Sequence, residues 1–535
     1  MAEKMKRKRP NIVIFNPDQM RADALGHLGN PAMPTSFLDE FAQNDAVSFR
    51  RAFCQNPVCG PSRCSFLTGL YPHVNGHRSM SYLLHSHETT LLKELKDAGY
   101  YVWMNPRNDF LAVQEAGILE RNANEVFYGG DINPAPGNKK NVRGTPGDKH
   151  FYSFYMGELD TDQEGKNKTI DDESVEKAVE LIQGYDKEEP FCIFLGLLYP
   201  HPPYQIEEPY FSAINRSLMK KRITEEETDL STKPKMMQEL KKLQGLDDFT
   251  EKDWDDIRSC YLGMCMKVDD LFKMLCDALK EKGVYDDTAI FFFSDHGDYT
   301  GDYGIAEKNQ NTFEDCLVNV PFLIKAPKGY DVSTGINENM VELVDFYATA
   351  MEMCQVQPAH AHYGKSLVPL LADKTVKGRK YVHSEGGRLK DEMQCSEATE
   401  AINPYNIYYP RFTAQQDHVA STKATMIRSD QYKYVKRLYE KDEFYDLLSD
   451  PKETHNKIDD HQYAPEIAEM RAELLNWYQA TCDMVPYEID VRLNFDMSWN
   501  RIKKMCPPDR EEEMKERLRN GEDMFYLMQC LVTGI

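Results

Sequence analysis

Three short stretches of the chain carry side chains whose types and positions could do chemistry. The first is Cys59-Gly-Pro-Ser-Arg-Cys-Ser-Phe-Leu-Thr-Gly69. Pro61 suits the first turn of a helix, so Cys59 should lie at a helix start. Free N–H groups and the positive end of the helix dipole stabilise an oxyanion there. The plain alternative is a helix-start cysteine whose thiol pKa is merely lowered.

The other two stretches combine acids with an amide and an imidazole. Asp18-Gln19 follows the apolar run 11–15, and Ser294-Asp-His-Gly297 follows the apolar run 289–293. Taken alone, each acid is more simply explained as a loop or cap residue. Together they place oxygen-rich ligands at the ends of two strands, which suits a hard divalent cation.

The first stretch, with Leu67-Thr68-Gly69 and Tyr71-Pro72 after it, resembles the signature of the formylglycine-dependent (type I) sulfatases of the alkaline phosphatase superfamily. The resemblance extends from Asn11 to Asp450. In that family a maturation enzyme oxidises the cysteine to an aldehyde. One hydroxyl of the aldehyde hydrate attacks sulfur, and the other later expels sulfate, which is covalent catalysis with its own release step. The resemblance therefore implies that Cys59 becomes formylglycine (3-oxoalanine).

The same resemblance implies one divalent metal. Its protein ligands would be Asp18, Gln19, Asp295 and His296, with the formylglycine made from Cys59 completing the shell. Calcium is the family default. Gln19 stands where many sulfatases carry a second aspartate, so the site has one carboxylate fewer and manganese is the alternative. The metal would acidify the attacking hydroxyl and neutralise charge on the sulfuryl oxygens.

Three further residues match the family's catalytic positions. Arg63 lies one helical turn beyond Cys59 and would stabilise the diolate and the metal-bound acid. His201, in Tyr199-Pro-His-Pro-Pro-Tyr204, would protonate the departing alcohol. Lys308 would bind a sulfate oxygen and the bridging oxygen. Each has a structural alternative, which for Arg63 is an ordinary salt bridge.

The sequence departs from the family pattern after Ala98-Gly-Tyr100. Sulfatases usually carry Gly-Lys-x-His there, but this chain has Arg107 and Asp109 at the aligned positions. Arg107 can hold a sulfate oxygen with two donors. Asp109 is a poor base beside an anion, and it could instead orient Arg107 or bind a substrate hydroxyl or ammonium group. His77 is the alternative base, and a purely structural histidine is an equal explanation.

These departures leave alternatives open. The leading hypothesis is a sulfatase that acts on a small sulfated carbohydrate or an aryl sulfate. Gln19 and the Arg107–Asp109 pair also fit a phosphonate or phosphate ester hydrolase on the same scaffold. A third hypothesis is a catalytically silent binding homologue, against which stands the full set of matching residues. The loops 129–150 and 385–418 could form the walls of a substrate pocket.

The elements that must position these residues follow from the hydrophobic pattern. Buried strands are expected at 11–15, 190–197, 288–294 and 320–325. Strands that alternate with helices predict an α/β fold, a largely parallel central sheet sandwiched by helices. Residues 425–439 instead alternate around a turn, as in an antiparallel hairpin. We therefore expect a catalytic domain over 1–374 and a smaller C-terminal α+β domain with an antiparallel sheet over 375–535.

The composition limits the partners and the compartment. The chain has 64 basic and 87 acidic residues and a net charge of -23, which repels nucleic acid. Its 13 cysteines include no Cys-x-x-Cys pair, which argues against a disulfide framework or a zinc ribbon. The apolar run after the basic start is too short for a signal peptide or a membrane span. We expect a cytoplasmic enzyme without membrane contact, matured by a formylglycine-generating enzyme; a homo-oligomer is left open.

Overall fold

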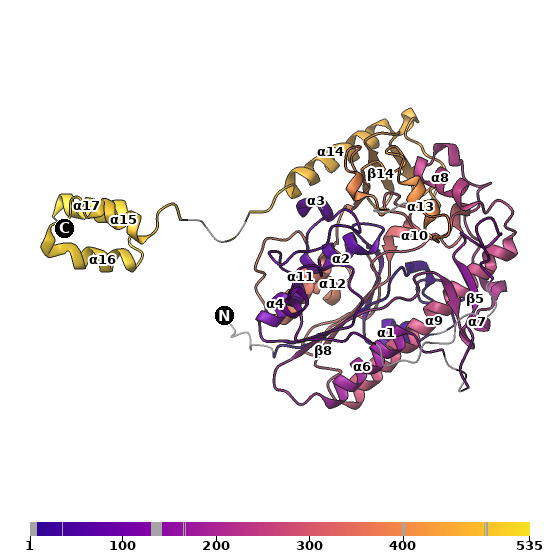
Figure 1. Cartoon of the computed structure of the whole chain (residues 1–535), viewed down its shortest axis with the longest axis horizontal. Helices are drawn as coiled ribbons and strands as arrows, with labels where there is room; N and C mark the ends of the chain where they lie inside the picture. Colours follow the sequence, from indigo (N-terminus) through magenta and orange to yellow (C-terminus); the bar gives the residue numbers. More distant parts are fainter. Residues whose placement is uncertain are drawn as a thin grey trace. The chain divides into compact units, whose positions relative to one another are not determined.

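The computed structural model describes the chain except residues 1–7, 35, 130–141, 164, 166, 399–401, 486, 488–490 and 535. The chain divides into two compact units, Met1–Met484 and Val485–Ile535 (Figure 1). Within the described residues, no helix is both long enough and apolar enough to cross a bilayer.

A large sheet forms the centre of the first unit. Among the described residues it has nine strands in the order β11-β2-β10-β8-β1-β6-β3-β4, with β9 paired to β2. The strands are β1 (Asn11–Asn16), β2 (Val47–Phe53), β3 (Tyr101–Met104), β4 (Glu125–Val126), β6 (Phe191–Gly196), β8 (Thr288–Phe293), β9 (Asn319–Val320), β10 (Phe322–Lys325) and β11 (Gly335–Glu342). β1 runs parallel to both neighbours, β6 and β8, whereas β10 is antiparallel to β8. The predicted α/β class with a mostly parallel sheet is confirmed.

Helices cover both faces of this sheet. The helices of the first unit are α1 (Phe37–Asn44), α2 (Cys59–Thr68), α3 (Pro72–Asn75), α4 (Leu91–Asp97), α5 (Ile118–Asn122), α6 (Ile170–Gly184), α7 (Tyr210–Ala213), α8 (Lys235–Gln244), α9 (Glu251–Glu281), α10 (Asp315–Val318), α11 (Val344–Cys354), α12 (Val368–Ala372), α13 (Tyr409–Ala414) and α14 (Ala464–Thr481). Ile12 and Ile14 of β1 pack in a core with α2, α4 and α11, while Val13 and Phe15 pack in a second core with α1, α6 and α9. Successive side chains of a strand point to opposite faces, so an unbroken apolar strand is the signature of a sheet covered on both sides.

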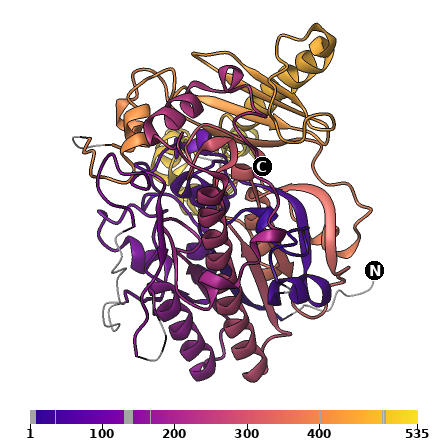
Figure 2. The same ribbon diagram turned by 90° about the vertical axis from the view of Figure 1, so that its right-hand side faces the viewer.

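The long helix α9 illustrates how local sequence sets an element's limits. It begins after Thr250, whose side chain forms a capping box with Asp253, and it ends before Gly283, which has a φ of +75°. Both features are common helix signals. Its apolar face packs alongside α6 over the sheet, where the two helices lie side by side in Figure 2.

A second, antiparallel sheet follows the large one in the sequence. Its order is β12 (Val382–Gly386), β13 (Ala424–Arg428), β14 (Tyr432–Arg437) and β15 (Glu443–Asp446). The predicted hairpin corresponds to β13 and β14, and α14 packs on this sheet through Ile467 and Met470. This sheet belongs to the same compact unit as the large sheet. The domain boundary at residues 374/375 stays a prediction.

The second unit is a small helical body. It contains α15 (Phe495–Ile502), α16 (Glu511–Arg519) and α17 (Met524–Thr533). Trp499, Ile502, Met514 and Leu527 form its own buried core. The sequence patterns did not separate these residues from the antiparallel sheet.

Candidate active site

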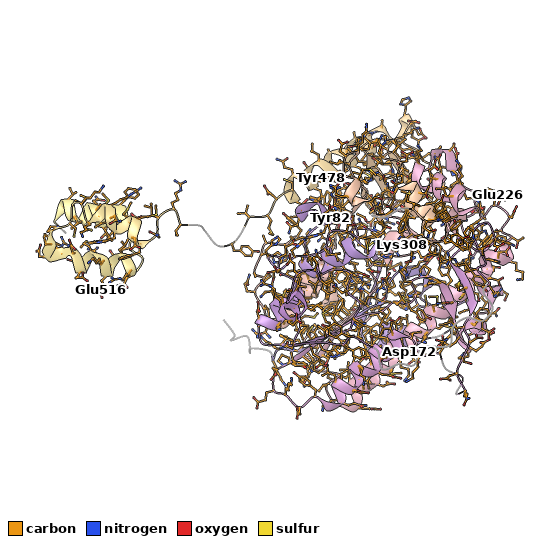
Figure 3. The ribbon with its side chains drawn as sticks, in the orientation of Figure 1. Tyr82, Asp172, Glu226, Lys308, Tyr478 and Glu516 are labelled. Atoms are coloured by element: carbon orange, nitrogen blue, oxygen red, sulfur yellow. The ribbon has the colours of Figure 1, made fainter. Side chains whose placement is uncertain are left out.

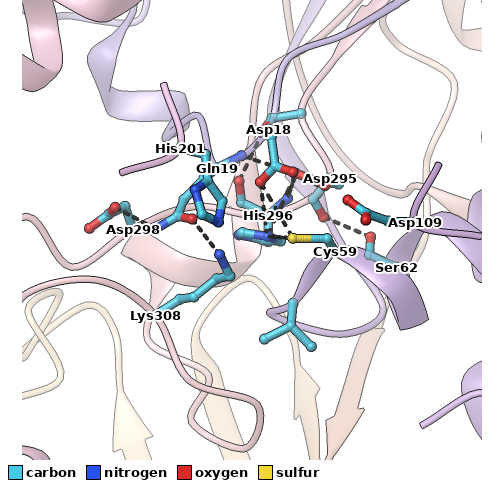
Figure 4. Close-up of polar contacts among 12 residues, drawn as sticks. Asp18, Gln19, Cys59, Ser62, Asp109, His201, Asp295, His296, Asp298 and Lys308 are labelled. Carbon is cyan, nitrogen blue, oxygen red and sulfur yellow. Dashed lines mark hydrogen bonds and ion pairs between the residues drawn. The ribbon is translucent and has the colours of Figure 1, made fainter. Parts of the chain in front are cut away.

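The topology brings two of the predicted stretches to one edge of the sheet. Asp18 and Gln19 follow β1, and Asp295 and His296 follow β8. These strands are parallel neighbours, with Phe15 opposite Phe292 at their carboxyl ends. Ligands of parallel α/β sheets bind beyond this edge. The third stretch joins them there, because α2 points its first residue, Cys59, at the same place (Figure 4).

Helix α2 begins at Cys59, as its sequence predicted. The preceding residue, Val58, makes no side-chain cap, so the first-turn N–H groups are not satisfied by a cap. The helix ends at Thr68, and the next residue, Gly69, has a φ of +70°; a Cβ added to Gly69 would lie 2.8 Å from the Tyr347 ring. Ser62 links the helix to the turn after β8 because its hydroxyl donates to the carbonyl oxygen of Asp295 at 2.7 Å.

Four buried residues form a cluster of metal-ligand type. Asp18, Cys59, Asp295 and His296 each offer one ligand atom, and these atoms lie within 4.8 Å of one another. Cys59 Sγ is 3.2 Å from His296 Nε2 and 3.5 Å from Asp18 Oδ1. His296 Nδ1 donates to the Gly297 carbonyl at 2.9 Å, which leaves the Nε2 lone pair for the cluster. Two carboxylates and a neutral imidazole are a donor set that fits a divalent cation.

Two arginines balance the buried carboxylates. Arg63 is fully buried and donates to Asp295 Oδ2 at 3.0 Å and to Asp18 Oδ2 at 3.1 Å. Arg107 donates to the same oxygen of Asp18. Burial would raise the pKa of Asp18, but the charge of Arg107, together with other nearby cations, holds it well below its usual value. Asp18 is therefore ionised at neutral pH.

Arg107 and Asp109, the two residues that differ from the sulfatase pattern, form an ion pair beside the cluster. Asp109 Oδ2 lies 3.1 Å from Arg107 Nη2 and 3.9 Å from Arg63 Nε. The side chains of Arg107 and Asp109 are each 23% exposed, whereas Arg63 is inaccessible. A substrate can thus reach Arg107 and Asp109 but not Arg63. The contact supports the expectation that Asp109 orients Arg107.

Lys308 lies in the interior of the first unit (Figure 3) and contacts Gln19. Its Nζ donates to Gln19 Oε1, while Gln19 Nε2 donates to Asp298 Oδ2 at 2.6 Å. Asp298 in turn accepts from the Tyr204 hydroxyl at 2.9 Å. The amide oxygen of Gln19 is thus directed at Lys308, and its role as a metal ligand stays a prediction. Sequence reasoning missed Asp298, although it lies three residues after Asp295.

His201 stands beside Gln19 and Lys308, to the left of the cluster in Figure 4. Its Nδ1 donates to the Pro202 carbonyl at 2.6 Å, which leaves Nε2 for a ligand. Burial and the charge of Lys308 lower the pKa of His201 well below its usual value. The ring is therefore neutral at pH 7 until an added negative charge favours its protonation.

His77 is not brought into contact with this cluster through its ring nitrogens. Its Nε2 is 2.8 Å from Glu88 Oε1, and its Nδ1 is 3.0 Å from the Tyr82 carbonyl oxygen. Both nitrogens are therefore occupied in contacts that hold the chain after α3 in place.

The loops 129–150 and 385–418 were expected to form the walls of a substrate pocket. In loop 385–418, Arg411 pairs with Glu307 at 2.7 Å and lies over the Tyr408 ring. Residues 399–401 of that loop and 130–141 of the other lie outside the described residues.

The model of the family described as Sulfatase matches residues 10–356. The chain belongs to the sulfatase family. This family is part of the alkaline phosphatase superfamily. The general activity of the enzyme is the hydrolysis of sulfate esters.

Relatives and solved structures cover most of the sulfatase chain. The multifunctional alkaline phosphatase superfamily protein PehA of Trinickia caryophylli is 26% identical over 89% of this chain and 96% of its own length. An arylsulfatase of Clostridium perfringens is 23% identical over 87% and 94%. Among solved structures, a phosphonate monoester hydrolase of Agrobacterium radiobacter has a TM-score of 0.69 at 21% identity, over 88% of this chain and 96% of that one. A 2-O GAG sulfatase has a TM-score of 0.65 at 20% identity, over 89% and 93%. These structures support the same fold.

Proposed function

We propose that the protein hydrolyses a small sulfate ester, a sulfated carbohydrate or an aryl sulfate, with Cys59 converted to formylglycine by a maturation enzyme. The observation that carries the proposal is the position of Cys59 Sγ. It lies within 4.8 Å of the ligand atoms of Asp18, Asp295 and His296, so the nucleophile and the metal ligands share one buried place. A hydrated aldehyde there supplies one hydroxyl for attack on sulfur and a second for the release of sulfate.

The proposed metal is calcium, with manganese as the alternative. Asp18, Asp295 and His296 would hold it through the atoms that face Cys59, and Gln19 would join them after a change of its amide contact. A divalent cation there would lower the pKa of a bound hydroxyl and offset the charge of the sulfuryl oxygens. A buried donor set of oxygens and one imidazole, with no pair of cysteines, supports a hard cation over zinc in a thiolate site.

The remaining residues would bind the substrate, position the metal ligands and transfer a proton. Arg107 and Lys308 present positive charge to the oxygens of the ester, and Arg63 holds Asp18 and Asp295 in position. The anionic substrate raises the pKa of His201, which can then protonate the departing alcohol from Nε2. Breaking the sulfur–oxygen bond sends the electron pair to the alcohol oxygen, which receives this proton.

A phosphonate or phosphate ester hydrolase is the second candidate. Three features favour it: Gln19 in place of an acid, the Arg107–Asp109 pair, and the 26% identity to the protein named as multifunctional, PehA. Sulfuryl and phosphoryl groups need similar charge stabilisation, so one site could accept both.

Parallel assays with an aryl sulfate and an aryl phosphonate ester test the choice. The protein should be expressed with a formylglycine-generating enzyme, and Cys59→Ala is the matched control for each substrate. We expect a higher kcat/KM for the aryl sulfate and no turnover of either substrate by the control. A strong preference for the phosphonate would replace the first candidate with the second. Turnover of neither substrate class would favour the silent binding homologue.

A further inference from the structure

A separate polar cavity lies beside the Asp18–Gln19 turn and includes none of the cluster residues. Its charged and hydroxyl-bearing lining consists of Arg21, Asp23, Lys220, Arg258, Tyr261 and Thr300. Its volume is about 40 Å³, which is room for about three water molecules or one small polyatomic ion. Three of these side chains are cationic and one is anionic, so the lining carries net positive charge.

The negative charge of Asp23 is already balanced within the cavity wall. Arg21 donates to both carboxylate oxygens of Asp23, at 2.7 Å each. Its other terminal nitrogen donates to Thr300 Oγ1 at 2.7 Å and lies 2.9 Å from Asp302. Both carboxylate oxygens of Asp23 are therefore bound by Arg21. Asp23 is not within ion-pair distance of the other two cations, Lys220 and Arg258.

Arg258 and Lys220 are the cations that lack close partners. The nearest carboxylate to Arg258 is Asp255, at 3.9 Å, and Arg258 donates no hydrogen bond among the described residues, although its side chain is only 17% exposed. Lys220 has neither an ion pair nor a hydrogen bond in the described part of the chain, and its Nζ lies 3.9 Å from the position of an added Cβ on Gly29. Burial lowers the pKa of Arg258, and the charge of Arg21 lowers it further against the opposing charge of Asp302. The Arg258 guanidinium is thus partly shielded from water and has its nearest carboxylate at 3.9 Å, an arrangement in which a bound anion would be a favourable partner.

The cavity also offers a neutral donor. Thr300 Oγ1 accepts a hydrogen bond from Arg21, so its own proton is available to another acceptor. Thr300 is a non-glycine residue with a φ of +45°, a backbone conformation that persists only where the surrounding contacts hold it.

We propose that this cavity binds a small tetrahedral oxyanion, inorganic phosphate or sulfate, between Arg258, Lys220 and Thr300. The guanidinium supplies paired planar donors, and the lysine supplies a point charge from the solvent side. The Tyr261 hydroxyl at the cavity wall accepts from the Arg21 amide and donates to the Gln19 carbonyl, each at 2.8 Å. The anion therefore binds against the backbone turn that carries Asp18.

Calorimetric titration of the full chain with phosphate, and separately with sulfate, tests this site. Arg258→Ala should remove one binding event per chain, whereas Arg258→Lys should retain it. Lys220→Ala removes an exposed side chain, so it should fold normally and weaken that event by about 10-fold, the effect of losing one charged partner. Lys252→Ala is the matched control, because it removes a cation of α9 that pairs with Asp256 outside the cavity.

Crystals soaked in selenate provide the second measurement. We expect an anomalous peak beside the Arg258 guanidinium in the wild type and in Lys252→Ala, and none there in Arg258→Ala. Whichever of phosphate and sulfate binds more tightly identifies the ion. Selenate found only at Cys59, or unchanged binding by Lys220→Ala and Arg258→Ala, would overturn the proposal.

Discussion

The surroundings of Cys59 disfavour ionisation of its thiol. Burial and the charge of Asp18 raise its pKa well above the usual value for a thiol. A protonated, buried thiol is a poor nucleophile. This environment disfavours the alternative of a helix-start cysteine with a lowered thiol pKa. It supports the proposed conversion of Cys59 to formylglycine, whose hydrate would attack through an oxygen atom.

Substitution of Arg107 tests the role of the two residues that differ from the sulfatase pattern, Arg107 and Asp109. It is an accessible cation that contacts Asp18, and its Nη2 lies 3.1 Å from Asp109 Oδ2. Arg107→Ala should lower kcat/KM for an aryl sulfate by about 10²–10³, as the loss of one transition-state donor does. Asp109→Asn keeps the cation but loosens it and should cost about 10-fold.

Steady-state kinetics of the two variants check this, with Arg50→Ala as control. Arg50 forms an exposed pair with Glu338 and should leave kcat/KM unchanged. A larger loss in Asp109→Asn than in Arg107→Ala would mean that Asp109 acts on the substrate itself and not only through Arg107.

At the scale of the elements, the turn after β8 depends on a close contact. A Cβ added to Gly297 would lie 2.0 Å from the carbonyl oxygen of Cys316. Gly297→Ala must therefore displace the Asp295–His296 turn. We expect a loss of about 1–3 kcal/mol in the free energy of unfolding and about 10² in kcat/KM. Gly184→Ala, which meets nothing within 4 Å, should lower neither quantity in the same assays. Full activity of Gly297→Ala would contradict this role for the glycine.

The junction of α1 with α9 gives the protein a predictable response to pH. Asp269 of α9 accepts from the backbone N–H groups of Phe37 and Leu38, and burial raises its pKa from 3.8 to about 6. The folded state therefore binds more protons than the unfolded state between these values, so this contribution to stability falls as pH rises from 4 to 6. The fall can reach about 3 kcal/mol.

Denaturant unfolding of the wild type and Asp269→Asn at several pH values measures this contribution. The free energy of the wild type minus that of the variant should decrease as pH rises through the window. A difference that does not change with pH would contradict the assignment.

The arrangement of the elements also explains which parts of the site could be predicted from the sequence. Asp18 and Asp295 could be placed together because each follows an apolar strand of a parallel sheet. The contact of Arg107 with Asp18 could not be foreseen, since it depends on β3 lying beyond β6 in the strand order. The pairing of Arg411 with Glu307 joins residues 104 positions apart, and no local pattern indicates it. The pairing of His77 with Glu88 likewise depends on the path of a loop.

At the scale of the whole molecule, every residue of the proposed site belongs to the first unit. The second unit has its own core around Trp499 and Leu527. A chain that ends at Met484 should therefore fold and keep kcat/KM within about twofold of the full chain. Circular dichroism and kinetics of the two proteins check this. Loss of activity in a folded truncated chain would mean that residues 485–535 take part in the reaction.

The identity of residue 59 after maturation tests the central claim most directly. The peptide that contains Cys59 should be weighed after expression with and without a formylglycine-generating enzyme, and kcat for an aryl sulfate measured on the same samples. Conversion replaces the thiol sulfur by a carbonyl oxygen, so the account predicts a lighter peptide and activity in proportion to the converted fraction. An unchanged peptide mass in a sample that hydrolyses sulfate esters would contradict it.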